Sequence, residues 1–180
     1  LILEYKIRQA QEKGTKYIQV GKANKRADLN LEAGNDKFIA LLNGLMNQMA
    51  GSADAKLKSE IDRFDVLQEE LKSFSMDQLI KLTGYDKVTI DTFMEMLRDK
   101  NVVFIFEPTE SKFRRETLEA VANYLLLSGK IGDPQNGLIL GDIDLNSTGV
   151  KEMGTDPDYL PGIVSLSEKD QIARISKEWG

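Results

Sequence analysis

The sequence of 180 residues contains no cysteine and no histidine. Without cysteine, this chain forms no disulfides, thiolate zinc sites or iron–sulfur ligation, and it has no cysteine nucleophile. Without histidine, it has no Ser-His-Asp triad, no histidine general base and no histidine-ligated metal. Any chemistry within the chain must therefore rely on carboxylate, lysine, tyrosine or serine side chains, or on a cofactor.

Long apolar runs are missing as well. No stretch approaches the roughly 18–20 consecutive apolar residues that span a bilayer, and residues 1–14 show no signal-peptide pattern. We therefore expect a cytoplasmic location without a transmembrane segment, with at most peripheral association through a membrane complex. The net charge of −5 argues against a broad nucleic-acid-binding surface, and we expect no nucleic-acid partner.

The spacing of apolar residues predicts helices that alternate with a few short strands. The strands are expected at residues 16–20, 28–32 and 102–106, and the last of these is continuously apolar, as in a strand covered on both faces. Helices are expected at 1–13, 35–50, 111–128 and 165–179. In the helix at 111–128, the expected buried side chains are Phe113, Leu118, Val121, Ala122 and Leu125.

Three further helices are predicted between the second and third strands. Apolar residues from Leu57 to Leu71 form the stripe of the first helix. Ser75 and Gln78 have the spacing of a capping box at the start of the second helix, which Gly84 ends. Asp86 is expected to cap the third helix.

These elements predict an α/β protein with a Rossmann-like, mostly parallel sheet that is truncated at its N-terminus. The core is expected at residues 1–135, with a helical insert at about 54–100. Residues 136–180 are expected to form a Gly/Pro-rich extension and a short helix, because half of the 14 glycines and three of the four prolines lie within 129–162. The chain begins with leucine rather than methionine, so we expect a fragment of a longer protein.

Two segments are candidates for ligand binding. In open α/β sheets, ligands bind beyond the carboxyl ends of the strands, and the loop after residue 20 offers Gly21 and Lys22 there, followed by Lys25 and Arg26. The glycine and the positive charges of this loop are suited to binding a phosphate. The alternative interpretation is a solvated basic turn on the surface. The second segment holds Gly34 and Asp36, where a helix start presents free N–H groups. Here the alternative is that Asn35 or Asp36 only caps the helix.

The sequence assigns neither a metal site nor a catalytic residue. The segment from Asp142 to Thr148 has oxygen side chains at alternate positions, but the glycine and glutamate that a calcium loop requires are Ser147 and Met153. Residues 129–134 lack the P-loop spacing and fit a helix end followed by a turn.

Several short segments, taken in order, resemble the central part of the molybdopterin oxidoreductase family. The similarity extends to formate dehydrogenase alpha subunits and to the large iron–sulfur subunit of NADH dehydrogenase (complex I), and it covers nearly the whole chain. The segments that carry it are 14–20 (GTKYIQV), 27–29 (ADL), 34–36 (GND), 40–45 (ALLNGL), 122–132 (ANYLLLSGKIG), 146–149 (NSTG), 153–154 (MG) and 156–162 (DPDYLPG).

The resemblance implies a Rossmann-like domain of an electron-transfer oxidoreductase that helps to hold molybdopterin guanine dinucleotide. It maps Gly21, Lys22, Gly34 and Asp36 to the guanine nucleotide end of this cofactor, and the later glycine-rich segment to the pterin and molybdenum end. Iron–sulfur clusters would be bound outside this chain. The expected partners are the remainder of the parent chain and other redox subunits, and the fragment alone is expected to be inactive.

The chain also departs from the family pattern. Gly21-Lys22-Ala23 replaces the family's Asp-Pro-Arg, and Glu107 and Glu110 stand where the family has a glycine-rich strand exit. These departures leave two forms of the redox interpretation, a cofactor scaffold and its degenerate remnant. The competing hypothesis is a non-redox α/β module that binds a nucleotide or a partner subunit.

Overall fold

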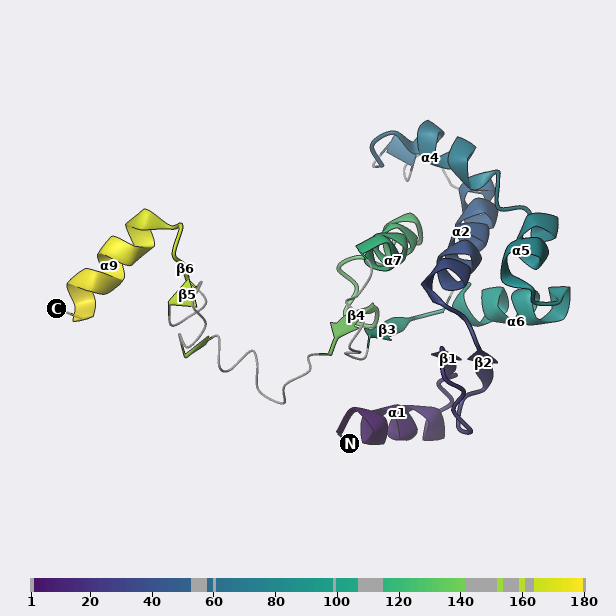
Figure 1. Cartoon of the computed structure of the whole chain (residues 1–180), viewed down its shortest axis with the longest axis horizontal. Helices are drawn as coiled ribbons and strands as arrows, with labels where there is room; N and C mark the ends of the chain where they lie inside the picture. Colours follow the sequence, from purple (N-terminus) through teal and green to yellow (C-terminus); the bar gives the residue numbers. More distant parts are fainter. Residues whose placement is uncertain are drawn as a thin grey trace. The chain divides into compact units, whose positions relative to one another are not determined.

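The computed structural model of the chain forms two compact units, residues 1–104 with 113–139 and residues 105–112 with 140–180. Figure 1 shows the order of the helices and strands along the chain. The residues that the structure describes are 2–52, 58–59, 61–98, 100–106, 115–141, 152–153, 159–160 and 164–179.

The first unit begins with a helix and two short parallel strands. Helix α1 (Ile2–Glu12) ends before Gly14, whose φ of +93° is a conformation that favours glycine. Strands β1 (Ile18–Val20) and β2 (Leu29–Leu31) pair in parallel, with Val20 opposite Leu31. The predicted helix and both predicted strands are confirmed.

Helix α2 (Asn35–Ser52) forms the centre of the first unit. It contacts α4 (Phe64–Leu71), α5 (Met76–Thr83), α6 (Lys87–Leu97) and α7 (Arg115–Leu127), and Figure 1 shows it between α5 and α7. Its buried positions include two runs of three consecutive residues, so more than one face of the helix is covered, as in a helix at the centre of a core. The buried residues of α2 are Phe38, Ala40, Leu41, Leu42, Gly44, Leu45, Met46 and Ala50.

The starts of the three helices after α2 agree with the predictions to different degrees. A single helix from Leu57 to Leu71 is wrong, since α4 begins only at Phe64 and Arg63 before it has the left-handed φ of 55°. The start of α5 follows Ser75 as predicted, but the serine side chain makes no capping hydrogen bond. The cap of α6 is confirmed, because Asp86 Oδ1 accepts a 2.8 Å hydrogen bond from the Thr89 amide.

The buried face of α7 differs from the predicted one. Ala122 is exposed, so its predicted burial is wrong, and Tyr124 is fully buried instead. The phenol ring of Tyr124 packs edge-on against Phe104, which in turn packs against Phe38 of α2. Burying a large ring removes more apolar surface from water than burying an alanine methyl, so these aromatic contacts set the rotation of the helix. Phe113 lies outside the described residues.

A second pair of strands follows the helices. The amides of Gly137 and Gly141 donate to the carbonyls of Val102 and Phe106, at 3.0 and 2.8 Å. Strands β3 (Val103–Phe106) and β4 (Gly137–Leu140) therefore run parallel. The expectation that the strand at 102–106 is covered on both faces is wrong, because Val103 remains 50% exposed.

The second unit contains a short antiparallel pair and a helix. Strand β5 (Tyr159–Leu160) pairs with β6 (Val164–Ser165), and helix α9 (Lys169–Trp179) follows. The predicted C-terminal helix is thus confirmed, although it begins a few residues later than expected. Ile172 and Ile175 lie half-buried along it, and its other described side chains are exposed.

The coarse α/β class is confirmed by the mixture of helices and short, mostly parallel strands. A Rossmann-like sheet remains a prediction, since the described strands form three separate two-stranded sheets rather than one. The proposed boundary at residue 135 also remains a prediction. Among the described helices, none combines the length and the apolarity needed to cross a membrane.

Candidate functional site

The first pair of predicted site residues, Gly21 and Lys22, directly follows β1. Gly21 has a φ of +101°, and its amide donates a 2.8 Å hydrogen bond to the carbonyl of Leu31, the last residue of β2. This bond turns the chain across the end of the two-stranded sheet. The loop that begins at Gly21 therefore lies at the carboxyl ends of both strands.

The loop between β1 and β2 is held by side chains on either side of it. Asn30 accepts from the Asn24 amide at 2.7 Å and donates to the Asn24 carbonyl at 3.1 Å. Gln11 of α1 donates to the Arg26 carbonyl at 2.9 Å, and the Arg26 guanidinium pairs with Glu4 at 3.1 Å. The path of the loop is thus fixed by polar contacts with α1 and β2.

The carboxylate of Asp28 connects the other end of this loop to the residues just before β1. Its carboxylate accepts from the Tyr17 amide at 2.9 Å and from the Lys16 ammonium at 3.0 Å. The hydrogen bond from the Tyr17 backbone, followed by that from Lys16, lowers the pKa of the Asp28 carboxyl below its ordinary value. The loop therefore depends on an ionised Asp28.

The cations of this region are not equivalent. Lys16 and Arg26 are engaged with Asp28 and Glu4. Lys22 and Lys25 are exposed and form no ion pair within the described part of the chain. Lys22, next to Gly21, is therefore the cation closest in sequence to the sheet end that has its charge available for an anion.

The second pair of predicted residues, Gly34 and Asp36, lies where the chain leaves β2 and enters α2. Helix α2 already includes Asn35 and Asp36, so Gly34 precedes the helix, and its carbonyl accepts from the Phe38 amide at 3.2 Å. A Cβ atom built on Gly34 would meet no atom within 4 Å, so packing does not require glycine here. The space beside the backbone is open to a ligand.

The two pairs are brought to one edge by the pairing of β1 with β2. Gly21 contacts Leu31 through its amide, and Leu31 stands three positions before Gly34. Asp36 lies in the first turn of α2, where a negative charge is favoured by the helix dipole. All four predicted residues therefore belong to the segments that leave the carboxyl ends of these two strands.

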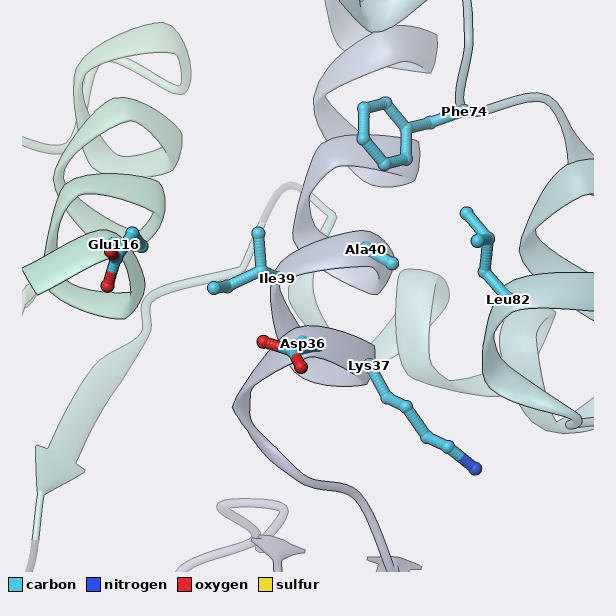
Figure 2. A pocket seen from close by; sticks show the side chains of 7 residues that line it. All are labelled: Asp36, Lys37, Ile39, Ala40, Phe74, Leu82 and Glu116. Carbon is cyan, nitrogen blue, oxygen red and sulfur yellow. The ribbon is translucent and has the colours of Figure 1, made fainter. Parts of the chain in front are cut away.

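Asp36 also borders a hollow of about 410 Å³ that extends over α2. Figure 2 shows Phe74 and Leu82 on the α5 side of α2, and Glu116 of α7 on the other side. The remaining lining residues are Lys37, Ile39 and Ala40. Its wall is mainly apolar. The sequence did not predict this hollow, because Phe74, just before α5, and Leu82 of α5 reach it only through the packing of α5 on α2, which leaves no local signal.

Lys37 contributes little positive charge to the hollow. Its ammonium lies 5.7 Å from the centre of the Tyr85 ring, and Figure 2 shows its side chain extending away from Phe74. Burial, followed by the nearby charge of Glu32, raises the pKa of the Tyr85 phenol above its ordinary value. Tyr85 is therefore neutral at physiological pH.

Of the two segments discounted as sites from the sequence, only residues 129–134 lie within the part of the chain that the structure describes. Within the described ranges, no group of three or more acidic side chains is arranged to hold a metal ion, and the segment 142–148 lies outside these ranges. Gly129 and Gly132 have φ values of +65° and +83°. They lie in turns directly after α7, which agrees with the predicted helix end.

Comparisons with known proteins show what the chain is similar to. No family model matches it. It is 27% identical over 129 residues to a putative formate dehydrogenase, YrhE, of Bacillus subtilis, which covers 70% of this chain and 13% of that protein. It is 25% identical to the assimilatory nitrate reductase catalytic subunit of the same organism, covering 95% of this chain and 26% of that protein. It is 24% identical to the F420-dependent formate dehydrogenase 2 subunit alpha of Methanococcus maripaludis, covering 94% of this chain and 26% of that protein.

These matches relate the chain, at low identity, to the molybdopterin oxidoreductase family, and they confirm the resemblance drawn from its short segments. The chain spans between 13% and 26% of the length of these relatives.

Proposed function

We propose that the chain is a domain of a longer molybdopterin-type oxidoreductase, and that the edge at the carboxyl ends of β1 and β2 helps to hold the nucleotide end of molybdopterin guanine dinucleotide. The observation that carries this proposal is the parallel pairing of the two strands. Because of this pairing, the loop that starts at Gly21 and the helix that starts after Gly34 leave the same edge. Ligands of α/β proteins bind at such edges.

The residues at this edge fit the chemistry of a nucleotide. The exposed ammonium of Lys22 and the positive end of the α2 dipole favour phosphate oxygens. Gly34 leaves room for the ligand to approach the backbone, since no atom lies where its Cβ would stand. The carboxylate of Asp36 accepts hydrogen bonds only, which matches the N–H groups of a guanine ring.

In this proposal the cofactor supplies the redox chemistry, and the chain binds and orients it. The chain has no cysteine, so iron–sulfur clusters would be ligated by other parts of the parent protein. We expect no turnover from the chain by itself. The names of the relatives favour a parent of the formate dehydrogenase or nitrate reductase type over an NADH dehydrogenase.

Titration of the isotope-labelled chain with GDP, followed by amide chemical shifts, tests the proposed site. We expect the shift changes to concentrate on Gly21, Lys22, Gly34 and Asp36. Lys22→Glu should weaken GDP binding about fivefold, because repelling one phosphate charge at an exposed site costs about 1 kcal/mol. Lys87→Glu is the matched control, since Lys87 is also exposed but lies on α6.

A second comparison separates base recognition from phosphate binding. Asp36→Asn should reduce the preference for GDP over ADP and leave binding of inorganic phosphate unchanged. Equal binding of GDP, ADP and phosphate by the unaltered chain would instead favour a simple anion site, as in the non-redox binding module. An absence of shift changes at these four amides would rule out the nucleotide site.

The parent protein distinguishes the two redox interpretations. Molybdenum together with guanine nucleotide in the purified parent would support a working cofactor scaffold. Iron–sulfur clusters without molybdenum would support a degenerate remnant that keeps only the fold.

A further inference from the structure

The buried phenol of Tyr124 and the half-buried side chain of Lys130 meet at the carboxyl end of α6. Tyr124 Oη donates to the Leu97 carbonyl at 2.9 Å. Lys130 Nζ donates to the same carbonyl at 3.2 Å and to Tyr124 Oη at 2.8 Å. We name these three residues the Lys130 clamp.

The chemistry of the clamp suits its position. Leu97 is the last residue of α6, and the last carbonyls of a helix lack partners within the helix. A positive charge is favoured at this end of the helix dipole. The ammonium also lies 5.0 Å from the centre of the Tyr124 ring, within the range of a favourable cation–π contact. The Leu97 carbonyl, which lacks a partner within the helix, thus accepts one hydrogen bond from the Tyr124 hydroxyl and a charge-assisted one from the Lys130 ammonium.

Lys130 adds a side-chain restraint to a short connector whose first residues also bond to the end of α7, since the Ser128 and Lys130 amides donate to the carbonyls of Tyr124 and Leu125 at 3.0 and 2.9 Å. The connector, residues 128–136, joins α7 to β4, and its glycines Gly129 and Gly132 both have positive φ. Between them, Ile131 is 62% exposed. Glycine has the largest backbone freedom to lose on folding, and the Lys130 side chain ties a residue between these two glycines to the end of α6.

The far end of the connector continues into β4. Asn136 accepts from the Val102 amide at 2.7 Å, and Gly137 donates to the Val102 carbonyl at 3.0 Å. Burial contributes little to this strand, since Leu138, Ile139 and Leu140 are 38%, 45% and 53% exposed. The attachment of β4 to β3 therefore depends on its few backbone bonds and on the conformation of the connector.

We infer that Lys130 is a conformational lock, whose ammonium keeps the connector in the one arrangement that lets β4 pair with β3. Without the ammonium, the connector and β4 open together while the helices around α2 stay folded. The opened state exposes the edge of β3 to another strand. The lock acts within the chain and does not depend on a bound cofactor.

Residue-resolved hydrogen exchange of the full chain tests the lock. Lys130→Met removes the charge and its donors but keeps an unbranched apolar stem. We expect the Gly137 and Gly141 amides to exchange about tenfold faster or more, the equivalent of losing one hydrogen bond to a charged group. Amides in the middle of α2 should keep their rates. Lys130→Arg should restore slow exchange, because the guanidinium also donates to the Leu97 carbonyl.

Two further variants keep the test decisive. Tyr124→Phe leaves Lys130 only the Leu97 carbonyl and should give a smaller acceleration at the same two amides, while Lys87→Met on α6 should give none. Unchanged exchange at Gly137 and Gly141 in Lys130→Met would overturn the lock. Equal acceleration at these amides and throughout α2 would also overturn it, because Lys130 would then support the whole fold rather than one movable strand.

Discussion

The helices around α2 and the edge formed by α1, β1 and β2 are held together by different forces. Leu41, Leu42 and Leu45 of α2 have no exposed surface, and Met46 has almost none. Among the described side chains of this edge, only Leu31 is fully buried, and the loop between the strands is fixed by Asn30, Asp28 and Gln11 through hydrogen bonds. Burial supplies most of the free energy of folding, and polar contacts at exposed sites add little.

The proposed nucleotide site and the α2 core should therefore differ in how easily they open. A site built on buried side chains is rigid, whereas a site built on exposed polar contacts opens locally at a small cost in free energy. The proposed nucleotide residues Gly21 and Lys22 lie in the second kind of region. We therefore expect variants of the α2 core to change the global stability, and variants of the edge to change local opening.

The largest effect is expected where α2 and α5 approach most closely. A Cβ atom on Gly44 would lie 2.3 Å from Leu79 Cδ1, and Leu79 is only 1% exposed, so it has no free space to move into. Gly44→Ala should lower the free energy of unfolding by about 1–3 kcal/mol, as overpacking of cores does. Urea denaturation followed by circular dichroism measures this change.

Gly51 supplies a matched control on the same helix. A Cβ atom there would meet nothing within 4 Å. Gly51→Ala should raise the free energy of unfolding by about 0.5–1 kcal/mol, because alanine has the better helix propensity. If both variants shift stability in the same direction, the close approach of α2 and α5 does not limit the core.

An intermediate effect is expected at the helix caps, which combine a polar contact with a buried helix. Asp86→Ala should measurably lower the free energy of unfolding, because it removes the bond to the Thr89 amide. Ser75→Ala should change it by clearly less, since the Ser75 side chain makes no cap bond. Thermal unfolding of the two single variants compares them. If both variants lose the same stability, the contribution of a capping residue depends on the local sequence alone and not on its hydrogen bond.

The caps also show what could be predicted from the sequence. The start of α6 follows from residues within that helix, and the prediction that Asp86 caps it is confirmed. The buried face of α7 was not predicted correctly, because it depends on the contact of Tyr124 with Phe104, which lies twenty positions earlier in the sequence. Local patterns determine where a helix forms, but distant contacts determine how it is rotated.

The same limit applies to the candidate site. The sequence placed Gly21 in the loop after a strand and Gly34 at a helix start, but their common edge depends on the pairing of Val20 with Leu31, which no local pattern encodes. The hollow beside Asp36 was missed, because Phe74 and Leu82 line it only through the packing of α5 against α2. Whether the four predicted residues bind a nucleotide stays a prediction.

The smallest effect, and the one most specific to the edge, is expected from the titration of Asp28. Its folded-state pKa is lowered, chiefly by the hydrogen bond from the Tyr17 amide and then by Lys16. A lowered pKa stabilises the folded edge at pH values above the ordinary aspartate pKa of about 3.9, and this contribution is lost as the pH falls through the folded-state pKa. Asp28→Asn should therefore accelerate amide exchange at Tyr17 and in β1 near neutral pH, but not at a pH below the folded-state pKa of Asp28.

The measurement is hydrogen exchange of the unaltered chain and of Asp28→Asn at two pH values, corrected for the intrinsic pH dependence of exchange. Amides of α2 serve as the internal reference, because their protection arises from burial and should be the same in both proteins. A difference at Tyr17 that persists at low pH would show that the shape of the side chain, rather than its charge, fixes the loop. An effect that spreads to α2 would contradict the separation of the polar edge from the apolar core, since the edge would then open only together with the helices.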